Sequence, residues 1–163
     1  MQPAPRSSRA PMPAGSSWCL ERRVLPQHTD HAGVMWHGAY LAWLEEARVE
    51  ALAAAGLAYS DLSARGLELP VVSLAIDYRQ ALLHGEVVQL RSEVGERRGV
   101  KLPWFSRFVR ADGQVAAEAR VELVLVDLSE GPARRRLLRQ LPADLQLAIQ
   151  RLTTGPDHPP SLP

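Results

Sequence analysis

The sequence predicts an α+β domain in which a curled antiparallel sheet wraps around one long helix. Apolar residues recur at three- and four-residue spacing over residues 38–55, which is typical of a helix. After Gly66 the period changes to two, as in strands that bury one face. Four strand-like runs then follow with short turns, and such connections favour an antiparallel meander. Because the helix is nearly apolar, the sheet must cover it.

The first half of the chain carries clear boundary signals. A first strand is expected over residues 18–25, and Pro26 ends it because proline brings no N–H to a strand ladder. A polar loop then leads into the long helix. Gly56 is a typical residue for the end of a helix, and a short second helix is expected over residues 59–65.

The second half reads as strands followed by a helix. The strands are expected within residues 71–78, 88–94, 102–108 and 115–127, and a last helix within residues 141–152. Asp112-Gly113 is a strong hairpin signal between the last two strands. Pro103 lies inside the third run, so that run calls for a bulge or an edge position.

Length and composition limit the class of protein. The chain has 163 residues and a net charge of +1, which suits one domain and disfavours binding to nucleic acid or to an anionic membrane. Residues 1–17 are expected to be a disordered leader, 18–152 the folded domain and 153–163 a disordered tail. One cysteine, Cys19, excludes an internal disulfide and points to the cytoplasm. We expect it to be a buried packing thiol.

The stretch from His28 to the start of the long helix carries the chemistry. It begins with turn-forming polar residues, and Asp30 stands a few residues before the helix N-terminus. A helix N-terminus offers unpaired N–H groups and the positive end of the helix dipole, which stabilise a developing oxyanion. A nearby carboxylate supplies a base or a nucleophile. This pairing of groups is suited to a reaction in which an oxyanion develops.

The same stretch resembles a known family signature. The segment T-D-H-A-G-V-M-W-H-G-A-Y-L-A-W-L-E-E-A-R is similar to the signature of the 4-hydroxybenzoyl-CoA and short-chain acyl-CoA thioesterases of the hotdog fold. The resemblance covers about residues 18–127. It implies that Asp30 is the catalytic carboxylate, as nucleophile or as general base. The backbone N–H of His37 would bind the oxyanion, and Gly33 would allow the tight turn between them.

The resemblance also implies a substrate and an assembly. The substrate would be a small aromatic or short-chain acyl-CoA, with no cofactor and no metal. The family places its site between subunits, so a homodimer is the minimum unit and a homotetramer is expected. Trp36, Tyr40 and Ser73 are assigned to the acyl group. A basic group is assigned to the phosphates of coenzyme A, namely Arg97, Arg98 and Lys101.

Several alternatives stay open at this point. Glu46 could be the catalytic carboxylate, because a related hotdog branch uses a helix glutamate. Zinc binding by the histidines around Asp30 is disfavoured, since the spacing H-x-D-H-x5-H matches no closed zinc site. The domain could also be a non-catalytic acyl-CoA-binding module, or a thioesterase that acts on acyl carrier protein.

Overall fold

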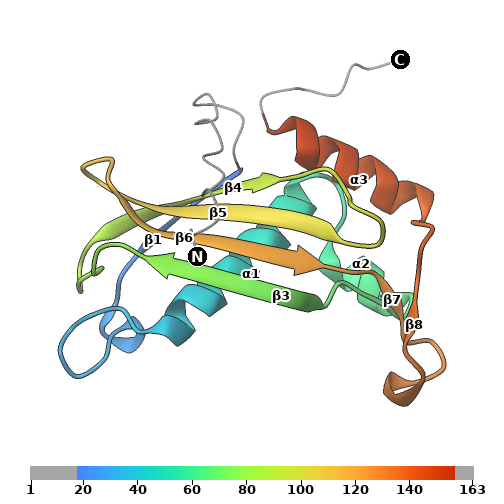
Figure 1. Ribbon diagram of the computed structural model, residues 1–163, viewed down its shortest axis with the longest axis horizontal. Coiled ribbons are helices and arrows are strands. Elements are labelled where there is room, and N and C mark those ends of the chain that lie inside the picture. Colours follow the sequence, from blue (N-terminus) through green and yellow to red (C-terminus); the bar gives the residue numbers. More distant parts are fainter. Residues whose placement is uncertain (1–17, 157–163) are drawn as a thin grey trace, which may run out of the picture.

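A five-stranded antiparallel sheet curls around helix α1 in the computed structural model, which describes residues 18–156 (Figure 1). The sheet order is β1-β4-β5-β6-β3, with β1 at Trp18–Arg23, β3 at Val71–Tyr78, β4 at Val87–Val94, β5 at Leu102–Arg110 and β6 at Val115–Leu123. A small sheet joins β2 (Leu67–Glu68), β7 (Val126–Asp127) and β8 (Arg136–Leu137). The helices are α1 (His37–Ala54), α2 (Tyr59–Ala64) and α3 (Ala143–Thr154), with short 3-10 turns η1 (Pro26–His28) and η2 (Pro132–Arg134). The predicted α+β class is confirmed.

Helix α1 buries the face that the apolar spacing predicts. Its buried residues are Ala39, Tyr40, Trp43, Leu44, Ala47, Ala51 and Leu52. The first half of this face packs with Phe108 and Leu90 of the sheet, and the second half packs with Trp104 and with α3. The core therefore lies between the sheet and α1, and α3 closes one end (Figure 1).

The position of β3 corrects the predicted meander. Strands β4, β5 and β6 do follow one another as a meander, but β3 pairs with β6 and not with β4. As the chain leaves β3, the N–H groups of Arg79 and Gln80 both donate to the carbonyl oxygen of Ala116 in β6. Residues 79–86 then cross the end of the sheet before β4 begins. The alternation of apolar residues indicates which face of a strand is buried, but it does not indicate which strands are neighbours. It therefore could not exclude this crossing.

The expectation for Pro103 was also wrong. Pro103 pairs with Glu122 in β5, which is a central strand with no register shift at this point. Its carbonyl accepts a hydrogen bond from Gly95 N at 3.0 Å, so its nitrogen faces the chain just past the end of β4. The missing N–H therefore falls beyond the paired length of β4, where it removes no ladder bond.

Strand β3 is an edge strand that leaves apolar side chains exposed. Leu74, Ile76 and Tyr78 lie opposite buried residues of β6, so they share the inner face of the sheet. Nevertheless Leu74 is 41% exposed and Tyr78 is 53% exposed. Within residues 18–156 no further strand pairs with the outer edge of β3.

The ends of the predicted domain differ slightly from the observed elements. Helix α3 continues through Thr154, so it includes two residues that the sequence assigned to the tail. The predicted leader at residues 1–17 and most of the predicted tail lie outside the described residues. Among the described helices, none combines the length and the hydropathy that a membrane span requires. The cytoplasmic location stays a prediction.

Candidate active site

Asp30 organises a tight loop that joins η1 to α1. Its Oδ1 accepts hydrogen bonds from the N–H groups of Ala32 at 2.9 Å and Val34 at 3.1 Å. The backbone N–H of Asp30 donates to Val34 O, and Gly33 N–H donates back to Asp30 O. Gly33 has φ +76°, a left-handed conformation that favours glycine. The Asp30 side chain is exposed, and one of its oxygens thus holds the loop in shape.

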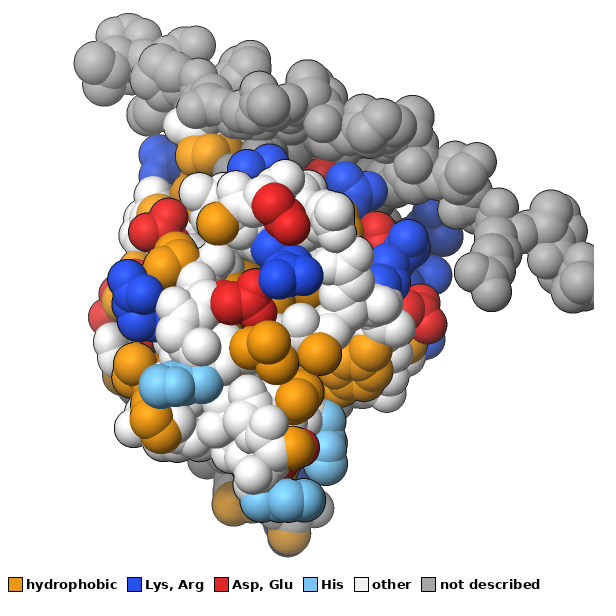
Figure 2. Space-filling model, turned by 90° about the vertical axis from the view of Figure 1, so that its left-hand side faces the viewer, with side chains coloured by type: hydrophobic (Ala, Val, Ile, Leu, Met, Phe, Trp, Pro, Cys, Tyr) orange, Lys and Arg blue, Asp and Glu red, His pale blue; other side chains and the backbone are white. Residues whose placement is uncertain are grey.

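The loop delivers the chain to a helix N-terminus that no side chain caps. Trp36 is the N-cap residue and makes no side-chain hydrogen bond to the first turn. The N–H of Trp36 donates to His28 O, and the N–H of Ala39 donates to Trp36 O. Within the described chain, the N–H groups of His37 and Gly38 have no backbone acceptor. They remain available for an anion at this end of the molecule, which histidine side chains border (Figure 2).

The Trp36 side chain lies against the first turn of α1. Its indole is 46% exposed and meets the His37 ring edge-on at 5.2 Å between centroids. A Cβ atom added to Gly38 would come within 2.2 to 2.6 Å of three indole ring carbons. Gly38 has no positive φ, so space and not conformation requires glycine here. The indole therefore lies beside the two open N–H groups.

Gly38→Ala is expected to push the indole away from α1 and to expose it further. The methyl group occupies the space that the ring now fills, while alanine raises the intrinsic helix propensity by about 1 kcal/mol. Quenching of tryptophan fluorescence by acrylamide measures the change, because Trp43 and Trp104 are only 3% and 2% exposed and half-buried Trp18 lies beside Ala51 and Ala54 at the far end of α1. Trp36→Phe, which removes the larger ring, is the matched control. Unchanged quenching in Gly38→Ala would contradict this packing.

Tyr40 lies one turn into α1 and is buried beneath the N-terminal end of this helix. Its ring contacts Tyr78 at 5.0 Å and Phe108 at 4.9 Å between centroids, both edge-on. Burial, followed by the charges of Tyr78 and Glu86, raises the pKa of Tyr40 to about 12. Tyr40 is thus a neutral aromatic residue at physiological pH. It links the first turns of α1 to the end of β3.

The other predicted substrate residues lie apart from Asp30 within one chain. Ser73 is exposed on edge strand β3. Arg98 and Lys101 close the tight turn between β4 and β5, where Arg97 donates to Leu138 O and Lys101 pairs with Glu122. The Asp30 loop lies at the opposite end of β4, whose eight residues span on the order of 25 Å. One chain therefore does not bring the basic group to Asp30.

The alternative site residues have local partners. Glu46 forms an ion pair with Arg22 of β1. His28 accepts a hydrogen bond from Leu25 N at Nδ1 and packs edge-on against Trp43. Among the residues that the structure describes, no three or more histidine, cysteine or acidic side chains gather as a metal site. Glu46 and His28 thus each have a partner within the chain.

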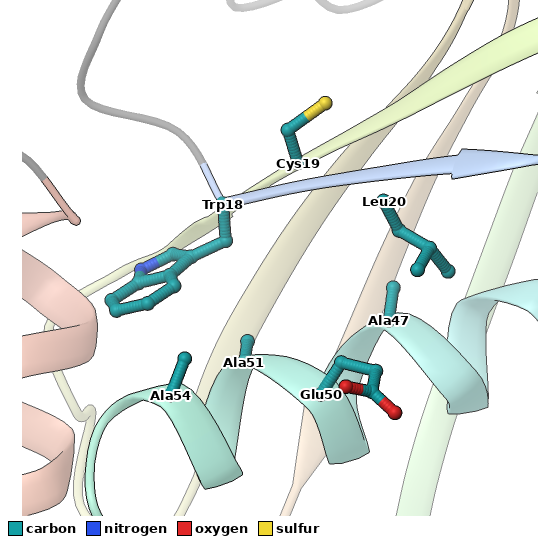
Figure 3. A pocket seen from close by; sticks show the side chains of 7 residues that line it. All are labelled: Trp18, Cys19, Leu20, Ala47, Glu50, Ala51 and Ala54. Atoms are coloured by element: carbon teal, nitrogen blue, oxygen red, sulfur yellow. The ribbon is translucent and has the colours of Figure 1, made fainter.

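Two cavities lie along α1, away from its first turn. One of about 220 Å³ lies between α1 and β1, where Trp18 and Leu20 point toward Ala47 and Ala51 (Figure 3). Cys19 points away from α1 in this view and is exposed, which corrects the prediction of a buried thiol (Figure 3). The prediction failed because Cys19 alternates with the inward residues of β1. Asp30 lines neither this cavity nor the second.

The second cavity, of about 170 Å³, lies on the opposite side of α1, at the start of β3. Its polar lining is Glu45, Arg48 and Tyr59, and its apolar lining is Val49, Leu52, Leu69, Pro70, Val71 and Leu123. Burial lowers the pKa of Arg48, and the charges of Glu45 and Tyr59 only partly offset this. Arg48 forms no ion pair within residues 18–156. The half-buried Arg48 side chain therefore lies on the side of α1 that is next to the start of β3.

Sequence patterns do not reveal the segment that holds the Asp30 loop. Local sequence patterns in residues 79–86 indicate only a turn at His84-Gly85, yet these residues contact the loop directly. Met35 N–H donates to Leu82 O at 2.8 Å, and His84 N–H donates to Gly33 O at 3.2 Å. These contacts depend on the crossing of the sheet end, which local patterns do not reveal.

Comparison with known proteins places this geometry in a family. A model described as the thioesterase-like superfamily matches residues 24–157. The Synechocystis protein sll0410, whose name classes it as an esterase, is 39% identical over 131 residues, 80% of this chain and 76% of that protein. The acyl-CoA thioester hydrolase YbgC of Escherichia coli is 30% identical over 105 residues, 64% of this chain and 78% of that protein.

Solved structures agree on the fold. Slr0204, a 1,4-dihydroxy-2-naphthoyl-CoA thioesterase from Synechocystis, superposes with a TM-score of 0.74 and 26% identity over 88% of this chain and 99% of that chain. The DHNA-CoA thioesterase from Staphylococcus aureus superposes with a TM-score of 0.73 and 23% identity over 82% and 89% of the two chains. The chain therefore belongs to the thioesterase-like superfamily and has the hotdog fold.

Proposed function

We propose that the protein is an acyl-CoA thioesterase that hydrolyses a small aromatic or short-chain acyl-CoA to the free acid and coenzyme A. The observation that carries this proposal is a carboxylate loop that leads directly into an uncapped helix N-terminus. Asp30 shapes that loop, and His37 and Gly38 offer open N–H groups at its end. The names of the relatives with 30% identity or more, an esterase and an acyl-CoA thioester hydrolase, support the same chemistry.

The chemistry follows from these two groups. The N–H groups at the start of α1 stabilise the negative charge that develops on the thioester carbonyl oxygen. Asp30 then acts by one of two routes. As a base it takes a proton from water, whose oxygen attacks the carbonyl carbon; as a nucleophile it forms an anhydride that water cleaves. In both routes the C–S bond breaks, the thiolate takes a proton, and one water is consumed.

The active unit in this proposal is a homodimer formed through the β3 face. We define that face as Leu74, Ile76 and Tyr78 of β3 together with Leu41 and Arg48 of α1. The exposed apolar residues of β3 and its unpaired edge are suited to antiparallel pairing with a second copy. Leu41 is 41% exposed and lies on the same side of α1 as Arg48, two turns earlier. Glu45 lies between Leu41 and Arg48 on α1. The β3 face therefore presents one negative and one positive charge to the same face of a second copy.

Antiparallel pairing of two β3 strands would complete the site. The Tyr78 end of one strand, beside Tyr40 and the start of α1, would meet the Val71 end of the other. The cavity beside Arg48 of the partner subunit would then adjoin Asp30. The same two-fold axis would carry the partner's Arg98 and the rest of its basic turn toward the end that holds Asp30. This arrangement supports a trans role in CoA binding for the three basic residues that one chain holds apart.

The nature of the acyl group rests on the aromatic residues near the first turn of α1. Trp36, Tyr40 and Tyr78 offer ring faces and edges close to the open N–H groups. Such surfaces suit a flat or short acyl group that leaves the thioester carbonyl at the helix end. Ser73, on the outer side of β3, would act only in a larger assembly, which is consistent with a homotetramer.

A panel of acyl-CoA thioesters tests the proposal directly. Release of the CoA thiol, followed with a thiol reagent, is expected for benzoyl and other aromatic groups and for short aliphatic groups. Turnover should persist in EDTA, because Asp30 and backbone N–H groups supply the chemistry. The same acyl groups on acyl carrier protein form the second arm of the assay. Binding of acyl-CoA without any turnover would overturn the proposal in favour of a binding module.

A further inference from the structure

The Asp30 loop depends on one other segment for its place in the molecule. Among the described residues, the backbone hydrogen bonds that leave residues 25–36, apart from the entry into α1, go to residues 79–86. Met35 N–H donates to Leu82 O, His84 N–H donates to Gly33 O, and Val34 forms a β-bridge with Leu83. Met35 and Leu82 are also buried together in one core cluster. Whatever fixes residues 79–86 therefore fixes the loop.

Glu86 fixes this segment with both of its carboxylate oxygens. Its Oε2 accepts a hydrogen bond from Leu83 N at 2.6 Å, in the residue that bridges to Val34. Its Oε1 accepts two hydrogen bonds from Arg110 of β5, from Nε at 2.9 Å and from Nη2 at 2.5 Å. One side chain thus connects a central strand of the sheet to the backbone that contacts the Asp30 loop.

Arg110 extends the connection to the start of the same segment. Its Nη1 donates to Gln80 Oε1 at 2.9 Å, so one guanidinium holds both ends of residues 79–86. The side chains of Arg110 and Glu86 are only 28% and 23% exposed. Partly buried hydrogen bonds between charged groups are stronger and less screened by salt than those on an open surface. We call this ion pair the Glu86–Arg110 brace, because it supports a loop that is otherwise exposed.

We infer that Glu86 and Arg110 are positioning residues that hold the Asp30 carboxylate and the start of α1 in their reactive arrangement, an inference that rests on the proposed function. They act through Leu83, Leu82 and the backbone of residues 33–35, and they touch no reacting atom. A loop held by only two backbone hydrogen bonds, which together form the Val34–Leu83 bridge, shifts readily when its support loosens. Because misplacement of a catalytic group by about 1 Å can cost up to a hundredfold in rate, the brace affects turnover more than substrate binding.

Glu86→Gln and Arg110→Met test the inference from the two sides of the brace. Each is expected to lower kcat roughly ten- to a hundredfold with KM nearly unchanged. Amide hydrogen exchange of Val34 and Met35 is expected to accelerate, while exchange in β5 and α3 stays as in the wild type. Arg110→Lys keeps the positive charge and should recover part of kcat. In an Asp30→Asn background, Glu86→Gln should cause no further loss of rate.

Asp127→Asn is the matched control. Asp127 also uses one carboxylate oxygen for a backbone N–H, that of Ser129, and the other for an arginine, Arg136. It lies in the small sheet, where the same loss should leave kcat and loop exchange unchanged. Exchange at Val34 and Met35 that stays slow in Glu86→Gln, or an equal loss of kcat in Asp127→Asn, would overturn the inference. The exchange experiment needs no substrate. It therefore still tests whether Glu86 and Arg110 hold the Asp30 loop in place, even if the acyl-CoA panel shows no turnover.

Discussion

Asp30→Asn is expected to lower kcat by about 10² to 10⁴-fold without unfolding the protein. Asparagine cannot take a proton from water or attack a carbonyl carbon as a carboxylate does. Its side-chain oxygen can still accept the hydrogen bonds from Ala32 and Val34 that shape the loop. Steady-state kinetics with the best acyl-CoA of the panel measures the loss, and thermal unfolding measures stability.

Asp112→Asn provides the control for this experiment. Asp112 forms the same kind of turn, with its Oδ1 accepting a hydrogen bond from Gln114 N at 2.9 Å. It lies in the hairpin between β5 and β6, so its replacement should change neither kcat nor the unfolding temperature appreciably. Full activity in Asp30→Asn would exclude both catalytic routes. A sharp fall in its unfolding temperature would assign Asp30 a structural role instead.

Leu74→Asp is expected to produce a monomer that lacks activity. Leu74 lies in the middle of the β3 face. In the proposed dimer, Leu74 of one subunit would be buried against strand β3 of the partner subunit. A carboxylate at such a position must either lose its hydration or prevent association, and preventing association requires the smaller cost. Sedimentation velocity measures the assembly, and the acyl-CoA assay measures turnover across a range of protein concentrations.

Leu147→Asp separates the effect of the interface from that of surface charge. Leu147 is 48% exposed on α3 and belongs to no face that we assign to a second copy. Its replacement should leave both assembly and turnover unchanged. A wild-type protein that sediments as a monomer, or a Leu74→Asp monomer with full turnover, would show that each chain acts alone.

Sequence periodicity predicted the elements well because burial leaves a direct trace in residue spacing. The buried positions of α1 and the inward residues of β6 follow the predicted faces. The order of strands left no such trace. Whether β3 lies beside β4 or β6 depends on the path of residues 79–86, and both paths bury the same side chains.

The same limit applies to the candidate site. Asp30, Gly33 and the helix start are close in sequence, so a short motif could indicate their chemistry. Glu86 and Arg110 are far from them along the chain, and their hydrogen bonds to the segment that contacts the Asp30 loop become evident only in the folded structure. Arg97, Arg98 and Lys101 show the converse, because the sequence reveals their charge but not their separation from Asp30 within one chain.

The displaced position of β3 also has a consequence for biosynthesis. The ribosome releases β3 well before β6, its only neighbour within the described chain, so the earlier strand has nothing to hydrogen-bond with while synthesis continues. Nascent chains that end before residue 115 would expose an unpaired strand that is rich in valine, leucine and tyrosine, and such strands are prone to aggregation. Release of such fragments should yield aggregates or chaperone-bound species, and solubility should return only once residues up to 123 have emerged.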